Sequence, residues 1–97
     1  MKIIWSPLAL ERVFEIAEYI AKDDINSSNH WVDVIFNKVK TLEKFPQSGR
    51  KVPEVKRIDI REITVGNYRI IYRIRKKQIN ILTVRHCRQI LPEDETK

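Results

Sequence analysis

The spacing of apolar residues changes once along this chain, and that change limits its fold more than any other feature. Up to about residue 45, apolar residues recur at steps of three and four, which is typical of amphipathic helices. From residue 58 to 86 they alternate with polar residues in runs rich in Ile, Val, Tyr and Thr, which is typical of strands. Because 97 residues form one core of modest size, the pattern predicts a single α+β domain.

The first half predicts a short strand at 2–5 followed by two helices. Ser6 can cap the first helix, and Pro7 suits its first position. The second helix is expected over 28–44 and to end before Pro46. The polar turn between the helices is short, so they should form an antiparallel hairpin packed on a mainly antiparallel sheet. The predicted order is strand, helix, helix, and three strands, with the domain over 1–91 and a polar, frayed tail over 92–97.

Two tight turns predict the register of the three later strands, expected at 58–65, 68–75 and 78–86. Gly66-Asn67 and Lys76-Lys77 both suit two-residue hairpin loops. Alternation then separates the side chains of two faces. The core face is expected to hold Ile63, Val65, Tyr68, Ile70, Tyr72, Ile74, Ile79 and Ile81. The opposite face is expected to hold Glu62, Thr64, Arg69, Ile71, Arg73, Leu82, Val84 and His86. A bulge would exchange the faces of all residues that follow it.

The polar residues of the opposite face are the candidate functional site. Guanidinium groups such as those of Arg69 and Arg73 bind phosphate or carboxylate through two hydrogen bonds. A neighbouring histidine, His86, can donate a proton near neutral pH. Alternatively, Glu62 pairs with the arginines across strands and the group only stabilises the sheet. Glu54 can act as a general base if its loop folds over the sheet.

Composition narrows the partners and the compartment. The net charge of +6 and the pI near 9.7 favour nucleic acid or an acidic protein as partner, although lysines also keep a surface soluble. A single cysteine, Cys87, excludes a disulfide within the chain and favours a reducing compartment. No apolar run reaches the roughly 20 residues of a membrane span, and the N-terminus lacks a signal-peptide pattern. A cytoplasmic protein without metal or cofactor is therefore expected.

Short motifs along nearly the whole chain match one protein family in their order and spacing. They are Trp5-Ser6-Pro7, Tyr19-Ile20-Ala21, Leu42-Glu43-Lys44-Phe45-Pro46, Gly49-Arg50, Val52-Pro53-Glu54, Arg61-Glu62, Gly66-Asn67-Tyr68-Arg69-Ile70-Ile71-Tyr72-Arg73, Val84-Arg85-His86 and Arg88. Through them the chain resembles the RelE/ParE superfamily of type II toxins. The resemblance implies the same order of strand, helices and sheet. It also implies a toxin that arrests growth when it is released from an antitoxin encoded by an adjacent gene.

The resemblance leaves two targets open. RelE-like members cleave mRNA in the ribosome, and for them it implies catalytic roles for Arg69, His86, and Glu54 or Glu62. ParE-like members poison DNA gyrase and are not enzymes. The lysine pair of RelE falls here on Ile60 and Glu62, and the long helix hairpin is more similar to ParE-like proteins, so a ParE-like toxin is favoured.

A third hypothesis is a nucleic-acid-binding module without catalysis. For a toxin, the partners are the antitoxin and either DNA gyrase or the ribosome with its mRNA, and no membrane is involved. The residues expected to contact the target or the antitoxin are Arg50, Lys51, Arg61, Arg69, Arg73, Arg85 and Arg88.

Overall fold

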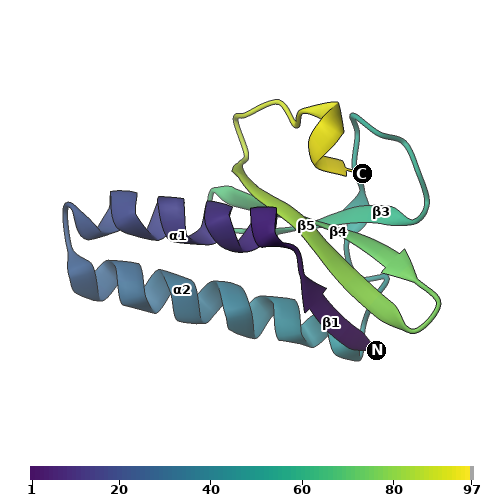
Figure 1. Ribbon diagram of the computed structural model, residues 1–97, viewed down its shortest axis with the longest axis horizontal. Helices are drawn as coiled ribbons and strands as arrows, with labels where there is room; N and C mark the ends of the chain where they lie inside the picture. The colour runs from purple at the N-terminus through teal and green to yellow at the C-terminus, as the bar shows by residue number, and fades with distance from the viewer. Residues whose placement is uncertain (97) are drawn as a thin grey trace.

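A computed structural model describes residues 1–96 and shows a two-helix hairpin against a five-stranded sheet (Figure 1). The sheet order is β1-β5-β4-β3-β2, with β1 parallel to β5 and the other neighbours antiparallel. This confirms the predicted α+β fold. The elements are β1 (Lys2–Trp5), α1 (Pro7–Ala21), α2 (Ile25–Lys40), η1 (Thr41–Glu43), β2 (Arg50–Lys51), β3 (Ile60–Val65), β4 (Tyr68–Arg75), β5 (Gln78–His86) and η2 (Glu93–Thr96).

The helix ends follow local capping chemistry. Ser6 accepts a hydrogen bond from the Ala9 backbone N–H at 3.0 Å, and Pro7 opens α1, as predicted. The expected start of the second helix at residue 28 was wrong, because Asp24 caps the helix earlier. Its carboxylate accepts from the Asn26 N–H and the Ser27 hydroxyl, both at 2.9 Å. The helix hairpin extends beyond the sheet at its connecting end (Figure 1).

The main core lies between the sheet and the near halves of the two helices. The core face predicted from the two turns is confirmed, since all eight of its residues are buried in this cluster or packed against it. The buried residues of the cluster are Ala9, Val13, Ile35, Val39, Leu42, Ile63, Ile70, Tyr72, Ile79, Ile81 and Val84. Burying such side chains contributes roughly 1.5–3 kcal/mol each, so this cluster dominates the stability.

A bulge in β5 changes the register that the sequence predicted. Across the Gly66 turn (φ 57°) the pairing is as expected, but between β4 and β5 the register shifts at Ile71 and Tyr72. Tyr72 pairs with Ile81, whereas Ile71 pairs with Thr83, which leaves Leu82 as the extra residue. Val84 and His86 therefore lie on the helix side of the sheet, and their predicted place on the opposite face was wrong.

The face opposite the helices is covered, not open. A second, smaller core of Val52, Ile60, Ile71, Leu82 and Leu91 is buried there, beneath the loop after β2 and the segment after β5. The expectation of a frayed tail was also wrong, because η2 packs against β5 and its last two residues are buried. Lys97 lies outside the described residues. No helix within residues 1–96 is long and apolar enough to cross a membrane.

Candidate functional site

Arg69, on β4, is the centre of the face opposite the helices and is only 6% exposed. Its Nε and Nη2 donate to Glu62 Oε1 at 3.1 and 2.5 Å. Its Nη1 and Nη2 donate to the two oxygens of Glu54 at 2.7 and 2.8 Å, and Nη1 also donates to the Gln89 carbonyl at 3.4 Å. An arginine has five N–H donors, and all five are directed at acceptors of this chain.

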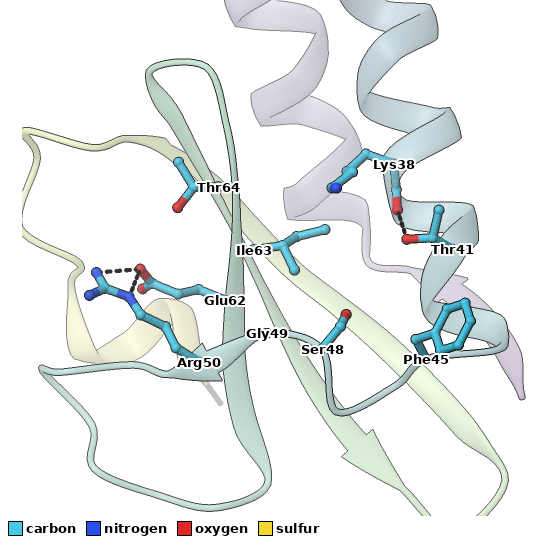
Figure 2. Close-up of a pocket in the computed structure, with 9 residues that line it drawn as sticks. All are labelled: Lys38, Thr41, Phe45, Ser48, Gly49, Arg50, Glu62, Ile63 and Thr64. Atoms are coloured by element: carbon cyan, nitrogen blue, oxygen red, sulfur yellow. Dashed lines mark hydrogen bonds and ion pairs between the residues drawn. The ribbon is translucent and has the colours of Figure 1, made fainter.

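Glu62, on β3, extends this arrangement to the edge of the sheet. The residue is 2% exposed, and its second carboxylate oxygen accepts from Arg50 Nε and Nη2 at 3.0 and 2.9 Å, as Figure 2 shows. Arg50, Glu62, Arg69 and Glu54 thus form a row of alternating charges, which we call the Arg69 network. It connects β2, β3 and β4 with the loop between β2 and β3, which carries Glu54. The cross-strand pairing of Glu62 with Arg69 is confirmed, whereas its pairing with Arg73 was wrong, because Arg73 binds Asp59 instead.

The Arg69 network changes the acidity of Glu54. The hydrogen bonds from Arg69 hold the pKa of Glu54 at about 2, with a further contribution from the Leu91 N–H, which donates at 3.1 Å. The same pairing with Glu54 raises the pKa of Arg69. The loop of Glu54 does fold over the sheet, as a catalytic role requires. However, a general base is most effective when its pKa lies near the working pH, so a carboxylate this acidic is a weak proton acceptor.

His86 is separated from the Arg69 network by the sheet. Its ring lies edge-on to Tyr68, with centroids 5.4 Å apart, on the side of the helices. Its Nδ1 accepts a hydrogen bond from the Arg88 backbone N–H at 3.1 Å. The β5 bulge is the cause, since it turns every second residue after Leu82 toward the helices. Of the four residues predicted for catalysis, the structure brings together Glu54, Glu62 and Arg69, but not His86.

The predicted contact residues do not form one surface. Arg73 donates to Asp59 at 3.0 Å, and Arg61 donates to the Gly49 carbonyl at 2.9 Å from the helix side of β3. Lys51 and Arg88 are exposed and have no acidic partner within residues 1–96. Their roles in binding stay predictions.

Glu95 is a structural residue that the sequence analysis missed. It binds Arg85 through Nε at 3.0 Å and through Nη2, Arg12 at 3.1 Å and the Thr83 hydroxyl at 2.7 Å. The hydrogen bonds from Arg85 are the main reason that its pKa lies at about 2. This carboxylate holds the tail against β5 and α1. The tail reads as polar and frayed in sequence, so no local signal identifies it.

Gly49, which is part of one family motif, is required at its position by close packing against β3 and Tyr72. Its N–H donates to the Tyr72 hydroxyl at 3.0 Å, and that hydroxyl donates to the Pro46 carbonyl at 2.8 Å. A Cβ at this position would lie 2.6 Å from both the Glu62 carbonyl oxygen and the Tyr72 hydroxyl. In the sequence, the only indication of this role is a glycine directly before the basic residues Arg50 and Lys51.

A groove of about 550 Å³ lies beside the Arg69 network, between the end of α2 and the edge of the sheet (Figure 2). Lys38 and Arg50 lie at its border, and Phe45, which is 63% exposed, contributes apolar surface. The two-residue β2 pairs with only two residues of β3, so positions 63–65 form an unpaired edge within the described chain. Such an edge can accept an extended segment of a partner. No group of three His, Cys, Asp or Glu residues within 1–96 could hold a metal ion.

The sequence model of one family, described as the ParE toxin of the type II toxin–antitoxin system parDE, matches residues 3–91. This chain belongs to the ParE toxin family. It is 35% identical over 94 residues to the Sinorhizobium fredii protein named "Putative toxin Y4kP", covering 95% of this chain and 94% of that one. The ParE fold is also seen in the chromosomal ParDE toxin–antitoxin system from P. aeruginosa. The TM-score is 0.74 at 21% identity, over 89% of this chain and 95% of that one.

Membership of the ParE family confirms the superfamily that the motifs indicated and the ParE-like branch within it. This ParE-family chain is the toxin of a type II system, and its family implies an antitoxin as partner.

Proposed function

We propose that this ParE-family toxin arrests growth by poisoning DNA gyrase and does not itself cleave RNA. The Arg69 network carries the proposal. In an RNase of the superfamily this arginine would bind the phosphate, but here its five N–H groups are occupied and its side chain is buried. Releasing it would leave one oxygen of the buried Glu62 carboxylate without hydrogen bonds, with only Arg50 on the other oxygen, and breaking a buried pair costs about 3–5 kcal/mol.

The other two candidate residues of an RNase site are also unsuited to their roles. His86, the candidate acid, lies on the helix side of the sheet, and Glu54, the candidate base, has a pKa of about 2. A gyrase poison needs a binding surface and no proton transfer, which fits a site whose charges are already paired. The alternative is ribosome-dependent mRNA cleavage, and the His86→Gln variant distinguishes the two functions.

For the antitoxin we propose that an extended segment binds the groove in Figure 2. The unpaired edge of β3 supplies backbone hydrogen bonds, and Phe45 supplies apolar contact. Lys38 and Arg50 at its border suit carboxylates of the antitoxin. Such border charges mainly accelerate association.

Expression of this chain alone should arrest growth, and co-expression with its adjacent antitoxin gene should restore it. The reason is that a free toxin reaches its target whereas a bound toxin is covered. Colony counts after induction, with and without the neighbouring gene, measure both effects. Normal growth at confirmed levels of soluble wild-type protein would contradict the assignment.

His86→Gln should remain toxic and should still inhibit gyrase supercoiling, because no proton moves on the toxin in this mechanism. An RNase that loses its acid would instead slow about 10²- to 10⁴-fold. His30→Gln, at an exposed position of α2, is the matched control, and the thermal midpoint shows that both variants fold. The RNase proposal would replace the gyrase proposal if the wild type cleaved mRNA on the ribosome and the folded His86→Gln variant had lost both this cleavage and the toxicity.

A further inference from the structure

The positive charge of this toxin is concentrated away from the connecting end of the helix hairpin. Residues 11–37 hold two basic side chains and six acidic ones, a net charge of −4, so the rest of the chain carries +10. The connecting end of α1 and α2, which lies in this acidic part, and the β4–β5 turn are at opposite ends of the longest axis (Figure 1). The charge is therefore distributed unevenly along the 39 Å length of the molecule, with an acidic end at the helix connection and a basic end at the β4–β5 turn.

The β4–β5 turn is the centre of the basic end. Arg75, Lys76 and Lys77 lie in and beside the turn, and Lys2 is adjacent because its N–H donates to the Lys77 carbonyl at 3.2 Å. On the other side of β1, the amino group of Met1 donates to the Glu43 carbonyl at 3.0 Å, which places the last turn of α2 and η1 nearby. Figure 1 shows this grouping at the N-terminus.

We define the basic end by six exposed residues that share one property, the lack of an acidic partner within residues 1–96. They are Lys2, Lys40, Lys44, Arg75, Lys76 and Lys77. Glu43 is the acidic residue between them. Elsewhere in the sheet, by contrast, four arginines each bind an acidic side chain: Arg50, Arg69, Arg73 and Arg85.

We propose that the basic end binds the phosphodiester backbone of nucleic acid without reading its sequence. The cores of protein interfaces are depleted in lysine and enriched in aromatic residues, whereas five of these six residues are lysines. The five lysines cannot stack on a base and contact nucleic acid through its phosphates, and Arg75 can bind phosphate through two hydrogen bonds. A shallow, open hollow lies along the turn and is lined by Ile74, Arg75, Lys76, Lys77 and Gln78, so a backbone strand can reach these side chains. This inference goes beyond the proposed function and does not depend on the identity of the target.

The test uses the purified chain alone, with labelled duplex DNA of two unrelated sequences, single-stranded RNA, and polyglutamate. We expect a dissociation constant of roughly 10⁻⁴ to 10⁻⁶ M at physiological salt, equal for the two duplexes. A plot of the logarithm of the binding constant against the logarithm of the salt concentration should be linear with a negative slope. Each contacted phosphate should add about 0.9 to the steepness of this slope for duplex DNA and about 0.7 for a single strand. The DNA and RNA arms identify which backbone is bound more tightly.

Lys76→Gln/Lys77→Gln should make the slope for duplex DNA shallower by about 1.8, because two phosphate contacts are lost. Neither lysine has a positive φ, so the turn tolerates both changes. Lys22→Glu is the control, because it removes the same net charge at the acidic end of the molecule, and it should leave the slope unchanged. Absence of nucleic-acid binding, an equal effect of the control, or equally tight binding of polyglutamate would each overturn the proposal. None of these measurements involves gyrase, so they fail or succeed independently of the proposed function.

Discussion

Replacing Arg69 with alanine is expected to lower the free energy of unfolding by about 3 to 5 kcal/mol, as does the loss of one partner from other buried ion pairs. The substitution removes the cation that Glu62 and Glu54 share. Glu62 is 2% exposed, so water cannot replace the lost hydrogen bonds, although Arg50 still binds its other oxygen. Urea unfolding followed by circular dichroism measures the change.

Arg57→Ala is the matched control, because Arg57 forms an exposed pair with Asp59 at 2.8 Å. Exposed pairs contribute about 0–1 kcal/mol, so this variant should be nearly as stable as the wild type. Arg69→Lys keeps the charge but loses the planar set of donors, so its stability should lie between those of the wild type and Arg69→Ala. If Arg69→Ala were no less stable than Arg57→Ala, the arginine would be free to bind phosphate, and the argument against RNA cleavage would fail.

Acid should destabilise the toxin strongly between pH 4.5 and 2, through Glu54 and Glu95. Both carboxyls have a folded-state pKa of about 2 against an ordinary value of 4.5. A lowered pKa in the folded state contributes stability that is complete above the ordinary value and is lost as pH falls through the folded value. At 1.36 kcal/mol per pKa unit, the buried Glu95 carboxyl contributes about 3 kcal/mol at neutral pH, and the more exposed Glu54 contributes less because solvent screens its ion pair.

The free energy of unfolding, measured by urea at pH 7, 4.5 and 3, should therefore fall steeply only below pH 4.5. Glu95→Gln should be less stable at pH 7, since it gives up the ion pairs with Arg85 and Arg12, and it should lose less stability on acidification. Glu93→Gln, an exposed position in the same η2, is the control and should behave like the wild type. If Glu95→Gln and the wild type lost equal stability in acid, the ion pairs of Glu95 with Arg85 and Arg12 would not be what holds the tail.

Local patterns in the sequence determined most of the fold. Ser6 and Pro7 placed the start of α1, and the Gly66 and Lys76 turns placed the strands and all eight residues of the core face. These signals suffice because a cap or a two-residue turn depends on neighbouring residues alone. The family motifs likewise identified a toxin, because their order and spacing can be read without any structure.

The tertiary structure alone decided the arrangement of the candidate site. A bulge of one residue at Leu82 moved His86 to the helix side, and no turn signal marks it. Glu54 binds Arg69, which is 15 residues away in the chain, and Glu95 binds Arg85, which is 10 residues away. Alternation gives the face of a strand only until the first irregularity, and an ion pair depends on which loops fold back over a face. For these reasons the sequence predicted a reactive cluster around Arg69, whereas packing produced a closed one.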